Sequence, residues 1–413
     1  MSNQYSQEDK DCLLTLLQAA LAENEQETKL ANKRMPVTAA KLFSEHKLLP
    51  IAIDVIKNRE TELQWQDYAA YKRSAKIQVM QQAQRGIEFL EVYDKLKEAE
   101  ITALVVKGCV CRTVWPKGEL RISSDEDVYV RPEEFEKACE ILRACGLVCD
   151  DHADTTNDFE IGWRKPDSTL YIELHQKLFT PDSGATGDLQ RFFDDAFDRA
   201  REYSVEHGSA KVWSMSPEDH LLYLLLHAYK HFIRSGFGIR QVCDIGLWAK
   251  RYVDEIDFSA LMRKLEEVHA LHFAAAVFAI AREDLGIDWR LPACWDEISV
   301  DRVPMRNDLL DGGVYGSATM SRQHSAPMTL EAVAASRENR KKASLLQRVF
   351  PPKERLLRNY PELVDHPTKL PLIWAKRLIK YRKETKTVEN NTLSESLRIA
   401  KEREELLHIY HII

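Results

Sequence analysis

Apolar residues return every three or four positions in parts of the first 98 residues. Two stretches show this spacing, one at Cys12, Leu13, Leu16, Leu17 and Ala20, the other at Ile87, Leu90, Tyr93 and Leu96. Apolar residues at this spacing share one face of an α-helix, which they bury against the rest of a domain. The pattern therefore predicts helices across this region.

The pattern changes after residue 100, where short runs of β-prone residues replace the helical spacing. We expect strands at 102–108, 127–130, 158–163 and 169–175. A turn at 165–168 should join the last two into a hairpin. A helix should separate the second and third, because Pro132 and Glu133 mark its start and Gly146 its end. Residues 100–180 form the only β-containing segment that we expect.

Helical patterning resumes after this segment. We expect a helix at 188–202, and a long apolar helix that begins at the capping sequence of residues 216–219 and runs to His231. Residues 311–316 include three glycines, and we expect them to form an exposed loop with the Ser-rich stretch that follows. A charged amphipathic helix at 393–408 should end the chain.

Composition favours helix outside the β-containing segment. The chain has 413 residues, of which 44% are hydrophobic and 30% charged, with only 15 Gly and 15 Pro. This length exceeds one ordinary core and predicts two or three folding units. The expected fold class is α+β, a small mixed β-sheet core embedded in a mainly helical chain. The expected divisions are an N-terminal helical region at 1–85, the core at 86–205, a helical bundle at 206–300 and a loop and basic helical C-terminal region at 301–413.

The net charge of −7 is unevenly distributed. Between Arg337 and Lys386 there are 15 Lys and Arg against five Asp and Glu, so this stretch carries +10 and the remainder −17. An acidic body argues against general nucleic-acid binding, which needs a basic main face. The chain has no apolar run near the roughly 20 residues of a membrane span and no signal-peptide pattern at its start. We therefore expect a cytoplasmic protein.

The eight cysteines include no CxxC pair, which argues against a zinc site or a disulfide framework. Most lie among apolar neighbours, where a free thiol behaves as a small hydrophobic side chain. We interpret them as reduced, structural residues.

Two acids mark the candidate chemistry. Asp125 and Asp127 lie two positions apart at the start of an expected strand, so their carboxylates should point to the same face. Two like charges this close are unfavourable unless a cation lies between them or one is protonated. Mg²⁺ prefers oxygen ligands and commonly shares them with substrate phosphates. The pair therefore predicts a magnesium site, although a solvated acidic turn would have the same sequence.

Residues on neighbouring elements extend this site. The preceding strand ends at Lys107 and Gly108, directly before an expected helix whose free N–H groups could hold phosphate. Ser123 and Ser124 flank the acids and could bind phosphate oxygens. Glu173, on a later strand, could complete a three-acid metal site or accept a proton from an attacking hydroxyl. His175 lies on the same face, and we interpret it as an orienting or structural residue.

Together these pieces resemble the polymerase-beta-like nucleotidyltransferase superfamily and, more narrowly, its large bacterial group known only as nucleotidyltransferase family proteins. The resemblance spans roughly residues 85–385. The matching residues are Val106, Lys107 and Gly108, Arg121 with Ser124, Asp125 and Asp127, Arg131, Pro132 and Glu133, Glu173, Leu174 and His175, Leu226, His227 and Asp244, and the segments 349–352 and 369–374.

The resemblance implies an enzyme that moves a nucleoside monophosphate from a nucleoside triphosphate (NTP) to a hydroxyl acceptor, which could be a small molecule, a sugar or a protein. It implies two Mg²⁺ ions held by Asp125 and Asp127, one of them shared with Glu173. The triphosphate would lie near a second group of residues, namely Lys107, Gly108, Arg121, Ser123 and Ser124.

Two departures from the superfamily pattern keep a second hypothesis open. Cys109 replaces the serine usual at the phosphate turn, and Glu126 replaces the apolar residue usual between the two acids. A buried Glu126 would need a partner, and we expect Arg121 or Arg131. The alternative is a catalytically degenerate nucleotide-binding or scaffold protein, peripheral to a membrane in surface-polymer synthesis.

Two further features have competing interpretations. His227 and His231 stand four residues apart, a spacing that suits zinc, but we favour a helix packed near the core, with Asp244 pairing with one of them or with Lys230. The basic segment 369–383 could lie on an anionic membrane or cover the triphosphate. We favour a helix packed on the body of the protein through Leu372, Trp374 and Leu378.

Overall fold

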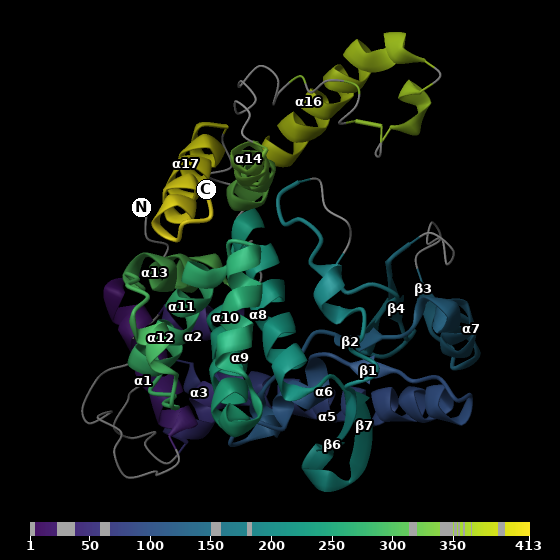
Figure 1. The fold of residues 1–413 in the computed structure, drawn as a ribbon, viewed down its shortest axis with the longest axis vertical. Coiled ribbons are helices and arrows are strands. Elements are labelled where there is room, and N and C mark those ends of the chain that lie inside the picture. Colours follow the sequence, from purple (N-terminus) through teal and green to yellow (C-terminus); the bar gives the residue numbers. More distant parts are fainter. Residues whose placement is uncertain are drawn as a thin grey trace.

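A seven-stranded mixed β-sheet lies among many helices in the computed structural model (Figure 1). The structure describes residues 5–22, 38–57, 67–149, 158–179, 184–313, 320–338 and 393–413, with parts of 350–386. The strands are β1 (Leu104–Val105), β2 (Glu126–Tyr129), β3 (Val148–Cys149), β4 (Glu160–Arg164), β5 (Tyr171–His175), β6 (Arg201–Val205) and β7 (Ala210–Ser214). Their order is β3-β4-β5-β2-β1-β7-β6. The expected α+β class is confirmed.

The pairing of β2 with β5 brings distant acids together. These two strands are parallel, and their register places Asp127 opposite Glu173 and Tyr129 opposite His175. β1 and β4 flank them on either side, both antiparallel to their neighbour. Because residues opposite each other on adjacent strands project to the same face, the register itself sets Asp127 beside Glu173.

Two of the strands correct the expected secondary structure. β6 and β7 lie outside residues 100–180, and the helix expected at 188–202 is instead a 3₁₀ turn, η4 (Gln190–Phe193), followed by irregular chain and the start of β6. In β6, Tyr203 and Val205 are buried while the residues beside them are exposed. Such alternation is the pattern of a half-buried strand. The antiparallel pairing with β7 gives this strand its hydrogen bonds.

The N-terminal region is helical as expected, with α1 (Gln7–Leu21), α2 (Ala39–Glu45), α3 (Leu49–Ile56) and α5 (Tyr68–Glu98). The long α5 runs under the sheet (Figure 1). Its Tyr93 hydroxyl donates to the Ala103 carbonyl at 3.1 Å and accepts from the Trp213 N–H at 2.7 Å, which ties the helix to the sheet. Ile87 was expected on the buried face but is exposed, because Phe89 and Val92 lie on the face of α5 that packs against the rest of the protein.

Helices after the sheet form a bundle beside it (Figure 1). They are α8 (Pro217–Arg234), α9 (Ile239–Arg251), α10 (Phe258–Glu267), α11 (Leu271–Ala279), the π-helical turn η7 (Ile280–Asp284), α12 (Ala293–Asp296), α13 (Val303–Gly312), α14 (Met320–Arg337) and α17 (Leu393–Ile409). The helix α16 (Leu370–Lys386) projects away from this bundle in Figure 1. Within the sheet region lie α6 (Gly108–Arg112) and α7 (Phe135–Ala144), with 3₁₀ turns η2 (Gly118–Leu120), η3 (Pro132–Glu134) and η5 (Glu206–Gly208). The remaining 3₁₀ turns are η6 (Val253–Glu255), η9 (Pro361–Leu363) and η10 (Pro367–Lys369).

Several expected helix boundaries are confirmed. Ser216 caps α8 by accepting from the Asp219 N–H at 3.2 Å, and α17 matches the expected C-terminal helix. The loop expected at 311–316 is wrong at its start, because Asp311 and Gly312 belong to α13. Residues 314–319 of that loop lie outside the described residues, and the stretch from residue 320 onward is helical.

Three helices meet at one buried carboxylate near the C-terminus. Asp308 of α13 pairs with Arg322 of α14 and with Arg403 of α17, each at 2.7 Å. Arg403 also donates to the Phe232 carbonyl of α8. These contacts fasten the last helix of the chain to the bundle.

The basic segment packs differently from the expectation. Ile373 is buried in a small cluster with Leu356 and Leu363, and Trp374 packs against that cluster. Leu372 was expected to pack, but its side chain is 64% exposed. The side chain of Leu378 and the 349–352 segment, apart from Phe350, lie outside the described residues. None of the helices described combines the length and apolar character that crossing a membrane requires.

All eight cysteines are free thiols, and four of them are buried. The four buried thiols, those of Cys109, Cys111, Cys139 and Cys243, belong to the hydrophobic core, which agrees with their expected structural role.

Candidate functional site

A cavity of about 330 Å³ opens between the sheet and the helices α8 and α9. The floor carries the acids of β2, β4 and β5, and the opposite wall carries basic residues of α8 and α9. Of the site residues expected from sequence, seven line this cavity: Lys107, Gly108, Arg121, Ser123, Asp125, Asp127 and Glu173. Segments more than 100 residues apart in sequence therefore meet at one site.

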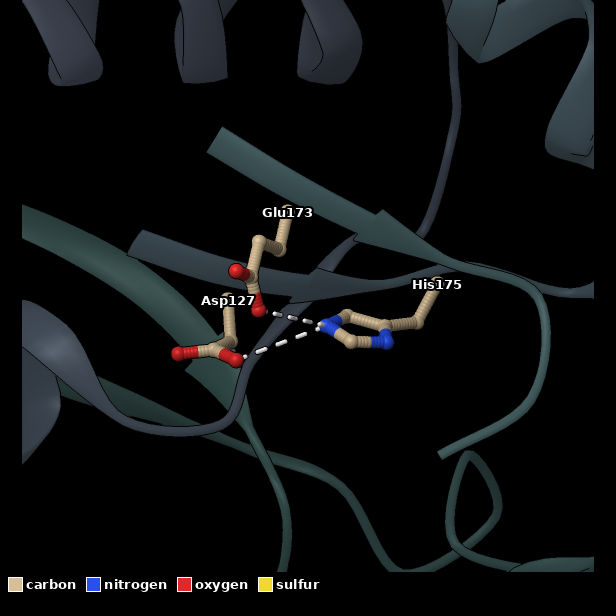
Figure 2. Close-up of side chains that lie close together, drawn as sticks. All are labelled: Asp127, Glu173 and His175. Atoms are coloured by element: carbon tan, nitrogen blue, oxygen red, sulfur yellow. Dashed lines mark ion pairs between the residues drawn. The ribbon is translucent and has the colours of Figure 1, made fainter. Parts of the chain in front are cut away.

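Asp127, Glu173 and His175 form the centre of the floor (Figure 2). Nε2 of His175 lies 3.4 Å from Oδ1 of Asp127 and 4.0 Å from Oε2 of Glu173. One ligand atom from each of the three lies within 4.8 Å of the others, so they could hold a metal ion. His175 thus contacts both acids, which fits an orienting residue. Asp125 lines the same cavity but is not part of this group of three.

Glu160 of β4 approaches the other nitrogen of the His175 ring. Its Oε2 lies 3.5 Å from Nδ1. The antiparallel register of β4 and β5 sets Glu160 opposite His175. A carboxylate therefore lies on each side of the imidazole, although neither ring nitrogen forms a hydrogen bond among the described residues.

Lys107 is the cation closest to these acids. Its Nζ lies 3.0 Å from Oδ1 of Asp127 and 3.2 Å from Nε2 of His227. Burial disfavours the charged ammonium, but Asp127 outweighs burial and raises the pKa of Lys107 well above its usual value. An ammonium therefore partly neutralises the acidic floor.

The two acids of the floor differ in their proton affinity. Burial favours the neutral form of Asp127, but Lys107 and His175 hold the pKa of this carboxyl well below its usual range. Burial and the Asp127 charge raise the pKa of Glu173 to about 7. Two close carboxylates resist simultaneous ionisation, so Glu173 keeps its proton to a higher pH.

Glu126 sits beneath the phosphate turn and not at a solvent-exposed edge. Its Oε2 accepts the Cys109 N–H at 2.8 Å, and its Oε1 accepts from Arg112 at 2.9 Å. The expected partners Arg121 and Arg131 are both wrong, because Arg112 on the short helix α6 is nearer in the fold. The buried carboxylate is thus fully paired, which offsets its desolvation cost.

Arg121 binds Asp244 and Ser123. Its guanidinium donates to both Asp244 oxygens, at 2.8 and 2.6 Å, and to the Ser123 hydroxyl at 2.7 Å. Trp115 donates to the same Asp244 at 2.7 Å. Asp244 was expected to pair with His227, His231 or Lys230, and this prediction is wrong because Arg121 and Trp115 bind its carboxylate. The contact braces α9 against the loop that leads into β2.

One face of α8 supplies residues that sequence analysis did not assign to the site. His227, Lys230, His231 and Arg234 line the cavity from this helix, and Arg240 and Gln241 from α9. Their signal in the sequence is a polar stripe at i, i+3, i+4 and i+7 on an otherwise apolar helix. Nε2 of His231 lies 3.3 Å from Nε2 of His227. Burial and Lys107 lower the pKa of His231 to about 3, so both imidazoles are neutral at pH 7.

A contact from the N-terminal region reaches the acidic loop. Lys47, which follows α2, donates to the Ser124 hydroxyl. Ser123, on the other side, accepts from Arg112 and donates its backbone N–H to Gln82 of α5 at 2.7 Å. Both serines are thus engaged by protein groups. Nothing in the local sequence around Lys47 predicted this contact.

The model of the uncharacterised nucleotidyltransferase family matches residues 34–286. The chain belongs to this family. It is therefore a nucleotidyltransferase, and its family match contains every residue of the cavity. A search of curated proteins and a search of solved structures each found no match.

The matched residues of this nucleotidyltransferase begin in the N-terminal helical region, which includes Lys47, and end after η7. The segments 349–352 and 369–374 lie beyond them. The family model thus covers the sheet, the helices beneath it and the first half of the bundle.

Proposed function

We propose that this nucleotidyltransferase is Mg²⁺-dependent, belongs to the polymerase-beta-like superfamily and transfers a nucleoside monophosphate from an NTP to a hydroxyl acceptor. The observation that carries the proposal is the in-register pair Asp127 and Glu173 facing a basic wall across one cavity. An acidic floor suits divalent metal, and a basic wall suits polyphosphate.

The residues of the floor fit a divalent cation. Oδ2 of Asp127 is buried and has no hydrogen-bond partner in the part of the chain that the structure describes. Burial and the neighbouring Asp127 charge raise the pKa of Glu173, so it holds its proton at unusually high pH. A divalent ion would satisfy the unpaired oxygen and favour the ionised form of both acids. We assign Asp125, Asp127 and Glu173 as its ligands, with two ions as in the superfamily.

In the proposed reaction the acceptor oxygen forms a bond to the α-phosphorus, and the bond from that phosphorus to the bridging oxygen of the β-phosphate breaks. Pyrophosphate leaves. The proton of the acceptor hydroxyl passes to the Glu173 carboxylate, which bound metal would keep ionised and so able to act as a general base. Bound Mg²⁺ would neutralise the phosphate charge and polarise the reacting oxygens. His175 orients both acids throughout.

A second candidate function is a degenerate NTP-binding or scaffold protein. The contact between Glu126 and the Cys109 N–H favours it, because a backbone donor of the phosphate turn is occupied by the protein's own carboxylate. Such a protein would bind Mg-NTP without turnover. Its attachment to a membrane is supported by the exposed Leu372 and Ile379 of the basic helix α16.

Pyrophosphate release separates the two candidates. We would incubate the full chain with Mg²⁺, each of the four common NTPs and a panel of hydroxyl acceptors, and measure pyrophosphate. We expect release that disappears in Asp127→Asn and persists in Asp167→Asn, a matched change in an exposed turn outside the cavity. Tight Mg-NTP binding without release for any acceptor would contradict catalysis and select the degenerate protein.

A further inference from the structure

The polar stripe on α8 is the least expected part of the cavity. Most of that helix is buried among apolar residues, including Leu225, Tyr229 and Phe232. One face instead turns His227, Lys230 and Arg234 into the cavity (Figure 1 shows α8 beside the sheet). Cations on a helix that is otherwise packed cost free energy unless something compensates their charge.

The protein itself supplies little of that compensation. Lys107 is paired with Asp127, and Arg121 with Asp244. Within the described residues, by contrast, the side chains of Lys230 and Arg234 form neither an ion pair nor a hydrogen bond. Burial lowers the pKa of Lys230, and the charge of Glu160 on the cavity floor offsets only part of that effect. These two cations are therefore available to an anionic ligand.

The usual location for phosphate is restricted in this chain. The Cys109 N–H points to Glu126, and the Gly108 carbonyl accepts from Arg121 at 3.4 Å. A phosphate at the turn would lie close to the buried Glu126 charge and would have to compete with it. The N-terminus of α6 is thus a poor anion site here.

The cations extend in one direction from the acids. Lys107 joins Asp127 to His227, where the stripe on α8 begins. With a rise of about 1.5 Å per residue, Lys230 lies roughly 4 to 5 Å and Arg234 roughly 10 Å farther along the helix axis. A ligand with its reacting phosphorus at the acids would therefore meet successive positive charges along α8.

We propose that Lys230 and Arg234 form the binding site for the β- and γ-phosphates, and so for the departing pyrophosphate. This inference rests on the proposed function, which locates the α-phosphate at Asp125, Asp127 and Glu173. Lys230 contacts the β-phosphate, and Arg234, which is more exposed and lies farther along α8, contacts the γ-phosphate. The basic wall replaces the phosphate turn as the holder of the polyphosphate.

Calorimetry with inorganic tripolyphosphate in EDTA tests the site without metal or turnover. We expect the wild-type chain to bind tripolyphosphate more tightly than phosphate at low salt. The double variant Lys230→Gln/Arg234→Gln should lose on the order of 10- to 100-fold in affinity, the range for lost charged hydrogen bonds. Lys211→Gln, at an exposed ion pair on β7, should change nothing. The melting temperature checks that each variant folds. The single variant Lys230→Arg keeps the positive charge and should retain most of the wild-type affinity for tripolyphosphate.

The outcomes separate this inference from the proposed function. Loss of tripolyphosphate binding in the double variant supports the site even if no NTP releases pyrophosphate in the wild type. Unchanged tripolyphosphate affinity in a folded double variant overturns it, and so does an equal loss in Lys211→Gln. If transfer occurs and the double variant keeps the wild-type KM for NTP, the inference fails while nucleotidyl transfer stands.

Discussion

The carboxylate of Glu126 occupies the space in which a side chain at Gly108 would lie. A Cβ built on Gly108 would stand 1.7 Å from Oε2 of Glu126, and the backbone there has a φ of +50°. Two separate features therefore require glycine at this position: the positive φ angle and the close approach of the Glu126 carboxylate.

Gly108→Ala should lower the free energy of unfolding by roughly 2 to 4 kcal/mol, the sum of an overpacking cost and a left-handed backbone cost. Urea denaturation measures it. Gly146→Ala is the matched control, because Gly146 also has a positive φ, of +82°, but open space around its Cβ position. We expect about 1 kcal/mol there. Equal losses at both positions would show that Glu126 is not fixed beneath the turn.

Asp125→Asn and Asp127→Asn should both weaken Mg²⁺-dependent NTP binding, but only Asp127→Asn should lower the melting temperature appreciably. Asp127→Asn leaves the buried Lys107 ammonium without its closest anion, whereas Asp125 forms no ion pair among the described residues. Calorimetry with Mg-ATP and thermal melts, run on both variants, give the comparison. Nucleotide binding that survives in both would make the acids structural.

Glu173→Gln should reduce turnover far more than NTP affinity, because a general base acts mainly in the transition state. We expect a rate lower by a factor on the order of 10² to 10⁴. Initial rates at saturating NTP measure it, with Glu140→Gln on the exposed face of α7 as the control. An unchanged rate would move the search to Glu160, which also lines the cavity.

The same substitution should change the pH dependence of stability. Folding raises the pKa of Glu173 from 4.5 to about 7, so the metal-free folded state binds this proton more tightly than the unfolded state does. The resulting stability is complete below pH 4.5 and is lost as pH rises through 7. In EDTA, Glu173→Gln should therefore gain about 2 to 3 kcal/mol relative to wild type between pH 4.5 and pH 8. Chemical denaturation at the two pH values measures this gain, and a constant difference would contradict the raised pKa.

The basic helix α16 offers three distinguishable outcomes. Lys376→Gln/Arg377→Gln should weaken binding to anionic vesicles by roughly 1 kcal/mol per charge if the helix lies on a membrane. It should weaken NTP binding, in a salt-dependent way, if the helix covers the triphosphate. We expect neither, and a loss of stability only in Trp374→Ala, since Trp374 packs on the Leu356 cluster. Vesicle flotation, calorimetry and melting curves measure the three.

The sequence predicts the structure where short-range patterns decide it. The spacing of Asp125 and Asp127, the cap at Ser216 and the limits of α7 all depend on neighbours within a few residues. The partners of buried charges do not. Arg121 and Asp244 are 123 positions apart, and no local pattern indicates that they meet. β6 and β7 were missed because charged residues on their exposed faces obscure short strands.

The basic wall was missed for a related reason. A polar stripe on an apolar helix can face solvent or a cavity, and only the packing of α8 against the sheet decides between them. His227 and His231 were noticed for their spacing, yet the spacing itself suggested zinc or packing. Lys230 and Arg234 face the acids Asp127 and Glu173 only in the folded structure, because those acids come from a different part of the chain.

The ion pair between Asp308 and Arg403 connects the C-terminal helix α17 to the helices around the cavity, although α17 itself contributes no residue to the cavity. Arg403 holds the Phe232 carbonyl, in the same turn of α8 that presents Lys230 and His231 to the cavity. This arginine lies far beyond the residues shared with the family. A helix outside the family-matched residues thus supports the wall of the cavity, so we expect substitutions at Arg403 to shift Lys230 and His231 without altering any residue that lines the cavity.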